Sequence, residues 1–318
     1  MNAKELNRNA KIILPGGAGL VGQNLVVWIK EQGYHNVVVL DKHEDNVATM
    51  RRLHPDIVVE CVDLAESGQW EHHFQGASAV VMLQAQISAK ESELFDRNNL
   101  LSTELIIGAI LEHSVPYTIH ISSSVVESVA DDDYTRTKRE QERMFLESGL
   151  QGIVLRPTLM FGWFDRKHLG WLARFMNRIP VFPIPGHGRY MRQPLYVGDF
   201  CQIILTCLKE QRNGGCYNIS GVECIDYVDM IRHIRTVVRA RCWIIHLPYW
   251  LFDVLLRLYA LFSSNPPFTS DQLKALTAGD EFEVINWPVI FGVKPTPFEA
   301  ALRETFDDPR FSHIELKF

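Results

Sequence analysis

The stretch Pro-Gly-Gly-Ala-Gly-Leu-Val-Gly at residues 15–22 decides the fold that this sequence predicts. A short apolar run precedes it, and a segment with the apolar spacing of an amphipathic helix follows it. In such a turn Gly16 allows a sharp change of direction. Gly19 lets a pyrophosphate approach the backbone, and Gly22 lets the helix pack closely on the sheet. The helix N-terminus then faces the phosphates, so the stretch is typical of a dinucleotide-binding unit.

An acidic residue stands where such a unit holds the adenosine ribose. Asp41 ends the next apolar run, 36–40, and lies 22 residues past Gly19. A carboxylate at this position accepts hydrogen bonds from the ribose hydroxyls and repels a 2′-phosphate. The sequence therefore predicts NAD as the cofactor in preference to NADP, although Lys42 follows directly and makes that preference partial.

Apolar runs alternate with helical segments through the first half of the chain. Strands are expected at 57–61, 79–83 and 117–121, and a helical region is expected at about 92–113. Strands that alternate with helices indicate an α/β fold with a parallel, doubly wound sheet, that is, a Rossmann domain.

The sequence predicts a second, smaller domain at the C-terminal side. The NAD-binding Rossmann domain is expected to take residues 1–161 and 196–222, and the substrate-binding domain residues 162–195 and 223–318. The smaller domain should cover the carboxyl edge of the sheet, where ligands of such folds bind. Its apolar stretch 247–262 is too short to span a bilayer and contains two charged residues. We interpret it as a core or lid helix in preference to a membrane-surface helix.

Composition excludes several classes of protein. The 318 residues carry a net charge of -6 with a pI of about 6.1, which argues against a nucleic-acid partner. The six cysteines show neither a C-x-x-C pair nor zinc-ligand spacing, which predicts reduced thiols and no metal site. The first residues are polar and lack the apolar run of a signal peptide, so a cytoplasmic location is expected.

A tyrosine and a lysine, Tyr134 and Lys138, stand four residues apart in Y-T-R-T-K. On a helix this spacing places both side chains on one face, one turn apart. A lysine cation beside a phenol favours the phenolate and lowers the pKa of the phenol. A general base that takes a proton from an alcohol needs this property. The acidic residues 131–133 just before the pair are expected to cap the helix.

Further motifs follow one another in order along nearly the whole chain. They are V-D-L at 62–64, N-x-x-x-T at 99–103, S-S-S at 122–124, L-R-P at 155–157, R-Q-P-L-Y-V-G-D at 192–199 and Y-N-I-S-G at 217–221. With the glycine turn and Y-x-x-x-K, this ordered set resembles an extended short-chain dehydrogenase/reductase of the NAD-dependent epimerase/dehydratase type. The resemblance also implies a homodimer formed through the two helices near 92–113 and 134–148.

The resemblance implies a role for individual residues. Ser123 is the expected catalytic hydroxyl, with Ser124 as the alternative, Tyr134 the acid/base, and Lys138 the residue that holds the nicotinamide ribose. Arg192 falls where nucleotide-sugar enzymes place a diphosphate-binding arginine, and Ser124 and Arg192 are therefore the substrate-binding candidates. The implied cofactor-binding residues are Gly16, Gly19, Leu20, Val21, Gly22, Asp41, Asp63, Leu64, Gln84, Tyr134, Lys138 and Pro157.

Departures from the family pattern narrow the reaction. Relatives that act as 4,6-dehydratases carry an Asp-Glu pair directly after the catalytic hydroxyl, whereas Ser124 and Val125 stand here. Decarboxylating relatives need a nearby glutamate, and the nearest one, Glu127, is displaced. We therefore expect chemistry at one carbinol of a nucleotide-sugar, UDP-linked in the simplest case, as C4 epimerisation or reduction of a keto sugar.

Two other readings remain open. The apolar stretch 247–262 suits a hydrophobic, steroid-like alcohol as substrate. The motif R-Q-P-L-Y-V-G-D also resembles an atypical branch that includes a subunit of respiratory complex I, so a non-catalytic dinucleotide-binding module is the other alternative. Aromatic residues Trp163, Phe164 and Trp171 are candidates either for core or for a sugar pocket.

Overall fold

A seven-stranded parallel sheet forms the centre of the computed structural model, which describes residues 6–129, 132–262, 273 and 285–317. The strand order is β11-β6-β5-β4-β1-β2-β3, and every neighbouring pair is parallel. The strands are β1 Ile12–Pro15, β2 Val37–Asp41, β3 Val58–Cys61, β4 Ala79–Met82, β5 Thr118–Ile121, β6 Gly152–Pro157 and β11 Cys216–Ile219. The order reverses between β1 and β4, so the predicted doubly wound Rossmann fold is confirmed.

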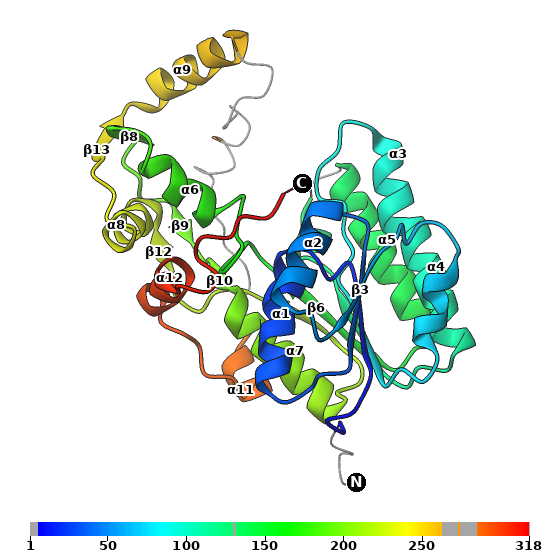
Figure 1. Cartoon of the computed structure of the whole chain (residues 1–318). Helices are drawn as coiled ribbons and strands as arrows, with labels where there is room; N and C mark the ends of the chain where they lie inside the picture. The colour runs from blue at the N-terminus through cyan, green and yellow to red at the C-terminus, as the bar shows by residue number, and fades with distance from the viewer. Residues whose placement is uncertain (1–5, 130–131, 263–272, 274–284, 318) are drawn as a thin grey trace.

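Helices cover both faces of this sheet (Figure 1). Ile12 and Leu14 of β1 point into one core, and Ile13 between them points into the other, as expected for a parallel sheet buried on both sides. The helices of this part are α1 Leu20–Glu31, α2 Glu44–Leu53, η1 Gln69–Phe74, α3 Ser92–Phe95, η2 Asp96–Leu101, α4 Ser102–Glu112, η3 Ser124–Glu127, α5 Asp133–Glu147 and α7 Val197–Glu210.

The helical region expected at 92–113 has an irregularity that the sequence pattern did not predict. It runs from α3 into α4 through η2, which is a π-helical segment. Such single-turn π segments often occur at functional sites because they change the direction of one or two side chains. Here the segment contains Asn99, which is fully buried.

A smaller set of elements lies beside the sheet, on the left side of Figure 1. Helix α8 packs between α6 and α12, and three two-stranded sheets pair β10 with β7, β12 with β9 and β13 with β8. The bounds are β7 Met160–Phe161, α6 Leu169–Met176, β8 Val181–Pro185, β9 Met191–Arg192, β10 Leu195–Tyr196, β12 Ile225–Asp226, α8 Tyr227–Val237, β13 Trp243–Leu247, α9 Tyr249–Phe262, α11 Trp287–Phe291 and α12 Phe298–Asp307.

One short helix assigned to the smaller domain touches the larger one. The indole of Trp287 on α11 donates to the carbonyl of Ser220 at 2.8 Å, and Arg212 donates to the carbonyl of Ile290 at 2.6 Å. Helix α11 therefore packs against the Rossmann part beside α7. The division of the chain into domains stays a prediction, and residues 263–272 and 274–284 of its second part lie outside the described residues.

The apolar stretch 247–262 forms a helix, α9, that is not part of a core. Its described side chains are half-buried or exposed, including Trp250 at 67%. None of the described side chains of α9 is fully buried, so the interpretation as a core helix is wrong, whereas the interpretation as a lid helix stays a prediction. Within the described ranges, no helix is both long and apolar enough to cross a membrane. All six cysteines are free thiols.

Candidate functional site

The predicted site residues come from six different strands but gather at one edge of the sheet. Parallel strands share the direction of their carboxyl ends, so the loops that follow them meet there. The glycine turn follows β1, Asp41 ends β2, Gln84 follows β4, and Ser123 follows β5. Asp63 and Leu64 follow β3, and Pro157 ends β6.

The glycine turn has the geometry of a phosphate cradle. Gly16 adopts a φ of 73°, and a Cβ there would lie 2.4 Å from the backbone of Gln84. A Cβ on Gly22 would lie 2.1 Å from the carbonyl oxygen of Gly17, so α1 approaches the turn closely. At Gly19, by contrast, a Cβ would meet only the carbonyl oxygen of Gly16, at 3.7 Å. The open side of Gly19, at the start of α1, fits the pyrophosphate of a dinucleotide.

Asp41 is held in place by the backbone around it. Its two carboxylate oxygens accept from the backbone N–H of Ala18 and of His43, each at 3.0 Å. Burial raises the pKa of this carboxyl, and the hydrogen bonds from His43 and Ala18 oppose that rise. The Nζ of Lys42 donates to the side chain of Asn98 at 2.5 Å. The carboxylate, not the lysine, is therefore fixed at the end of β2 beside the glycine turn.

The next acidic residue, Asp63, is part of a small ion-pair network. Arg97 from η2 donates to Asp63 at 2.7 Å and to Glu66 at 2.7 Å. Asp63 also accepts from the backbone N–H of Ala65 at 3.0 Å, and Leu64 beside it is buried. Arg97 thus connects the end of β3 to the π-helical segment.

The two hydroxyls predicted for catalysis lie together. Ser123 and Tyr134 come from the loop after β5 and from the first turn of α5, yet they lie close enough for the serine side chain to lower the pKa of the phenol. Asp132 caps α5 by accepting from the backbone N–H of Thr135 at 2.9 Å, which confirms the predicted cap at this residue. Ser124, the alternative serine, is buried as the first residue of η3. Of the predicted capping residues, Asp131 lies outside the described residues.

The pKa of Tyr134 does not follow the simple prediction. Burial raises the pKa of this phenol, the side chain of Ser123 lowers it, and the charge of Asp132 raises it further. Lys138 is not among the groups that shift this pKa, so the expected lowering by the lysine is not seen, and burial has the largest effect. Spacing along the helix predicts which side chains are neighbours, but the direction of the pKa shift depends on how deeply the fold buries them.

Lys138 is the most deeply buried cation of the site, with only 1% of its surface exposed. Its Nζ donates to the carbonyl oxygen of Ile121, the last residue of β5, at 3.0 Å. Burial lowers the pKa of Lys138 to about 8, and the charge of Glu142 on the next turn of α5 opposes this. The lysine therefore ties α5 to the strand that leads to Ser123.

A network of polar and charged side chains holds the loop that carries Ser122 and Ser123. The Oγ of Ser122 donates to Glu142 at 2.6 Å, and Arg156 on β6 binds both oxygens of that carboxylate. Arg156 also donates to Glu127 at 2.5 Å, and Asn218 on β11 donates to the other oxygen of Glu127 at 2.7 Å. The network thus joins the loop after β5 to α5, β6 and β11, next to Ser123.

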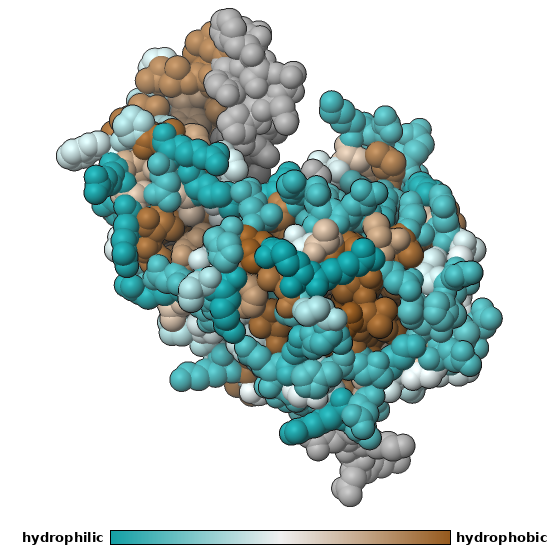
Figure 2. All heavy atoms as spheres, viewed as in Figure 1, coloured by the Kyte–Doolittle hydropathy of each residue, from teal (hydrophilic) through white to brown (hydrophobic). Residues whose placement is uncertain are grey.

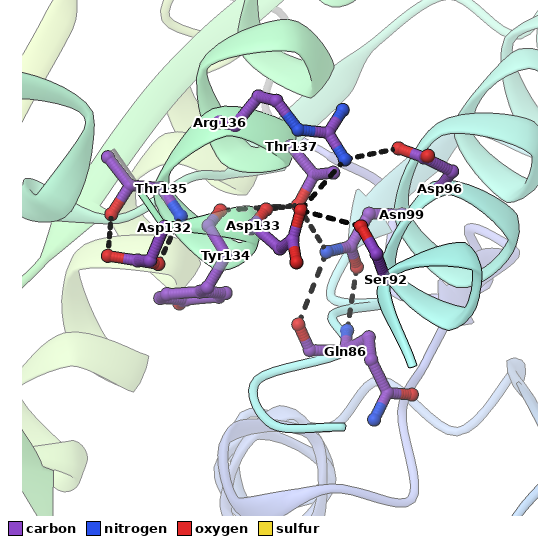
Figure 3. A network of polar contacts seen from close by, with 10 residues as sticks. All are labelled: Gln86, Ser92, Asp96, Asn99, Asp132, Asp133, Tyr134, Thr135, Arg136 and Thr137. Carbon is purple, nitrogen blue, oxygen red and sulfur yellow. Dashed lines mark hydrogen bonds and ion pairs between the residues drawn. The ribbon is translucent and has the colours of Figure 1, made fainter. Parts of the chain in front are cut away.

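A second network, shown in Figure 3, fixes α5 against the loop after β4. The buried amide of Asn99 accepts from the backbone N–H of Gln86 at 2.6 Å and donates to its carbonyl at 3.2 Å. The same amide nitrogen donates to Oγ1 of Thr137 at 2.9 Å. Gln141, one turn later, donates to the carbonyl of Asn99 at 3.0 Å and to Thr103 at 2.8 Å. In Figure 3 the ring of Tyr134 lies to one side of this network.

Gln84 belongs to the same region. Its side-chain nitrogen donates to Thr103 at 3.2 Å, while its buried oxygen has no hydrogen-bond partner among the residues that the structure describes. An unpaired buried acceptor beside the glycine turn is a group that a bound ligand could satisfy.

Arg192 and the predicted aromatic residues come from segments that follow β6 in the chain. Arg192 is on β9, where it pairs with Ile225 of β12, and it acts against the burial that raises the pKa of Tyr227. Trp163 and Phe164 are buried in a cluster with Phe311 and Leu316. These two aromatic residues are therefore core and do not line a sugar pocket, because the C-terminal segment covers them.

Several residues of the site had a weaker signal in the sequence. In the sequence Asn99 and Thr103 form a motif with no assigned role, and Arg156 is part of the motif L-R-P. Glu142 could have been found from its position one helical turn after Lys138, where a carboxylate meets a cation. Gln141 carried no signal, since its partners come from a different helix. Among the described residues no group of three or more His, Cys, Asp or Glu is placed to hold a metal ion.

Comparison with known proteins assigns the family. The model of the NAD dependent epimerase/dehydratase family matches residues 12–220, which is well over half of the chain. The chain belongs to this family, and it is an NAD-dependent enzyme of the extended short-chain dehydrogenase/reductase type. The predicted family, cofactor and enzyme class are confirmed.

Individual relatives are distant. A dTDP-glucose 4,6-dehydratase of Actinoplanes sp. is 24% identical over 66% of this chain and 76% of its own length. A decarboxylating sterol-4-alpha-carboxylate 3-dehydrogenase of Mus musculus is 24% identical over 81% of this chain and 76% of its own length. The crystal structure of a UDP-glucose 4-epimerase from Thermotoga maritima, with UDP-glucose, superposes with a TM-score of 0.73 at 19% identity and covers 93% of this chain and 97% of the epimerase. This last likeness concerns the fold.

Proposed function

We propose that this enzyme uses NAD to oxidise or re-reduce one carbinol of a nucleotide-sugar, as a C4 epimerase or a keto-sugar reductase. The observation that carries the proposal is the proximity of Ser123 and Tyr134 at the carboxyl edge of the sheet, where the serine side chain lowers the pKa of the tyrosine. It joins an acid/base and a second hydroxyl at the place where ligands of doubly wound folds bind.

Each residue of the trio has a separate task in this proposal. The chemistry that bound NAD supplies is the reversible acceptance of a hydride. Tyr134 takes the proton from the substrate hydroxyl and later returns it. Ser123 donates a hydrogen bond that stabilises the phenolate and orients the alcohol. Lys138, anchored on the carbonyl of Ile121, supplies positive charge beside the tyrosine and a donor for the nicotinamide ribose.

The cofactor cradle is proposed to consist of the glycine turn and the acidic residues that follow it. Gly19 and the backbone of Leu20 and Val21 face the pyrophosphate, and Gly16 and Gly22 keep the turn close to the sheet. Asp41 accepts from the ribose hydroxyls. The remaining contacts are proposed for Asp63 and Leu64 at the adenine and for Gln84 and Pro157 along the nicotinamide half.

The surroundings of Ser123 disfavour elimination chemistry. A dehydratase needs an acid and a base beside its catalytic hydroxyl, but Ser124 and Val125 occupy those positions. The nearest carboxylate in sequence, Glu127, is bound to Arg156 and Asn218 instead. We therefore propose chemistry at one carbon, although dehydratases are among the relatives by sequence.

The substrate class is proposed from the smaller part of the chain. Arg192 carries a guanidinium that can bind diphosphate oxygens in a bidentate manner, and Ser124 is close enough in sequence to Ser123 to contact the sugar. Several structures of the same fold contain UDP-sugars, such as UDP-glucose and UDP-glucuronic acid. A UDP-linked sugar is therefore the first substrate to test.

A hydrophobic alcohol is the second candidate. The exposed apolar helix α9 supports it, and so does the similarity to the mouse sterol dehydrogenase. Under this alternative Ser123, Tyr134 and Lys138 keep the same tasks, and only the binding of the alcohol differs.

The oligomeric state and the cellular location remain proposals. Dimerisation through α4 and α5 is supported by exposed apolar residues on these helices, among them Leu111 and Leu146. Light scattering of the purified protein tests it, and a monomer at micromolar concentration contradicts it. A cytoplasmic location is proposed from the sequence alone.

The function is tested by supplying NAD with a set of UDP- and dTDP-linked sugars and following the products by liquid chromatography and mass spectrometry. We expect conversion of at least one nucleotide-sugar, reduced about a thousandfold in Tyr134→Phe. The control is Tyr217→Phe on the edge strand β11, which should keep full activity. Activity on a sterol or another lipid alcohol with none on any nucleotide-sugar would reverse the choice between the two candidates.

A further inference from the structure

The two-stranded sheet of β8 and β13 has one face in the core and one face outside. The strands are parallel, with Val181 opposite Trp243 and Ile184 opposite His246. Phe182 and Ile184 are buried, whereas Val181 and Ile245 are exposed and Trp243 is 75% exposed. Since side chains alternate along a strand, the outer face presents apolar residues where polar ones are usual.

Helix α9 continues this outer face directly after β13. Its exposed residues are almost all apolar or aromatic, and Asp253 and Arg257 form an ion pair at 2.9 Å. Figure 2 shows hydrophobic residues gathered over α9. We name as the apolar ridge the exposed residues Val181, Trp243, Ile245, Tyr249, Trp250, Val254, Leu255 and Leu258.

Exposed arginines stand at the ends of the ridge. The backbone N–H of Trp243 donates to the carbonyl of Pro180 at 2.8 Å, which brings the starts of both strands together. Arg178 precedes one strand, Arg239 and Arg241 precede the other, and all three are exposed. At the opposite end Arg189 is also exposed.

The charge of this part of the chain differs from that of the rest. Residues 162–195 and 223–262 contain eleven Lys and Arg but only five Asp and Glu, whereas the whole chain has a net charge of -6. The sequence around the ridge therefore has an excess of basic residues, and four exposed arginines stand at the ends of the ridge. An anionic surface complements these arginines, and a second copy of the same face does not.

The dimensions and residue types favour a surface helix. A helix of 14 residues is about 21 Å long, which is shorter than the roughly 30 Å of a bilayer core. Tryptophan and tyrosine prefer the level of the lipid headgroups, and arginine reaches anionic headgroups from the same level. We propose that the apolar ridge docks on the surface of an anionic lipid bilayer, with α9 lying in the plane of the interface. This proposal does not depend on the substrate of the enzyme.

The test is sedimentation of the full chain with lipid vesicles. One set contains phosphatidylcholine alone, and the other contains phosphatidylcholine with an equal part of phosphatidylglycerol. We expect binding to the anionic vesicles that weakens as salt is raised, and little binding to the neutral ones. Binding to neither set of vesicles would overturn the proposal.

Two variants separate the contributions of the ridge and its arginines. Trp250→Ser with Leu255→Ser should weaken binding to anionic vesicles about tenfold or more. Arg239→Gln with Arg241→Gln should weaken it and flatten the salt dependence. The matched control is Val289→Ser on α11, which removes an apolar side chain of 76% exposure outside the ridge and should bind as the unaltered protein does.

Light scattering of the same proteins without lipid tests whether a second copy of the chain occupies the ridge instead. A dimer of the unaltered chain that dissociates in the Trp250→Ser, Leu255→Ser variant would assign the ridge to a second copy and overturn the proposal. The same oligomeric state in both proteins, together with loss of vesicle binding in the variant, supports the bilayer.

Discussion

The Nζ of Lys138 lies 3.0 Å from the carbonyl oxygen of Ile121, so a buried cation on α5 is bonded to the last residue of β5. This bond connects the helix that carries Tyr134 with the strand that leads to Ser123. The trio is thus positioned by backbone and not by contacts among its own side chains alone. The cation is also held in a place where its charge is unfavourable, since burial lowers the pKa of Lys138 to about 8.

The first prediction concerns Lys138→Met, which removes this buried charge and keeps most of the side-chain volume. At pH 7 the lysine is charged in both states, and its folded pKa of about 8 lies below the unfolded value of 10.5. The charged folded state is disfavoured by about 3 kcal/mol, less the value of the bond to Ile121. We therefore expect the variant to lose activity while its free energy of unfolding rises by about 1–3 kcal/mol.

The pH dependence of this difference checks its cause. Between pH 8 and 10.5 the unfolded chain holds the lysine proton more tightly than the folded chain, so the disadvantage of the lysine disappears as the pH rises. Urea unfolding at pH 7 and at pH 10 should show the gap between Lys138→Met and the unaltered protein narrowing. A gap that stays constant or widens would contradict the assignment of the cost to the buried charge.

The second prediction distinguishes the two candidate serines. The side chain of Ser123 lowers the pKa of Tyr134, so Ser123→Ala should raise that pKa and move the acid limb of the kcat/KM profile to higher pH. We also expect kcat to fall about a hundredfold. Ser124→Ala, at an equally buried neighbour, should keep the position of the limb, and the opposite pattern would make Ser124 the catalytic hydroxyl.

The third prediction concerns the buried amide of Asn99. Its side chain makes three hydrogen bonds to Gln86 and Thr137, so Asn99→Ala leaves buried groups without partners. We expect a loss of about 2–4 kcal/mol in the free energy of unfolding, measured by urea titration, together with lower kcat because α5 shifts. Asn98→Ala, at the less buried neighbour, should change stability by less than about 1 kcal/mol. Equal effects of the two variants would remove Asn99 from its positioning role.

The sheet could be predicted from the sequence because the residues that determine each strand and turn are neighbours along the chain. The glycine turn and the apolar runs gave β1 to β5 within one or two residues of their observed ends. The spacing of Tyr134 and Lys138 gave their common helix in the same way. These features depend on the periodicity of neighbouring residues, which a single sequence displays.

Other properties of the site could not be predicted because they depend on packing between distant segments. The pKa of Tyr134 rises through burial, and Asn99 meets its partners only where η2, α5 and the loop after β4 converge. The same holds for α9, whose apolar sequence predicts a core or lid helix, whereas several of its side chains are exposed in the structure. An apolar composition predicts that a surface is covered, but it does not identify the partner that covers it.

The fourth prediction concerns the choice of cofactor. Asp41→Asn keeps the size of the side chain but removes the charge that accepts from a ribose and repels a 2′-phosphate. We expect the affinity for NAD to fall about tenfold and the preference over NADP to shrink, measured as the ratio of the two Kd values by calorimetry. Lys42→Ala is the control, because that ammonium is bound to Asn98. An unchanged ratio in Asp41→Asn would place the ribose elsewhere.

The fifth prediction separates the folding role of the glycine turn from its binding role. Gly16 has a φ of 73° and no room for a Cβ, so Gly16→Ala should cost about 3 kcal/mol or more of unfolding free energy. Gly19 has an ordinary φ of -78° and open space, so Gly19→Ala should fold within about 1 kcal/mol of the unaltered protein. Its added methyl stands where the pyrophosphate approaches, and NAD affinity should fall at least about tenfold. If Gly19→Ala binds NAD normally in the same calorimetric titration, the phosphates do not lie at the start of α1.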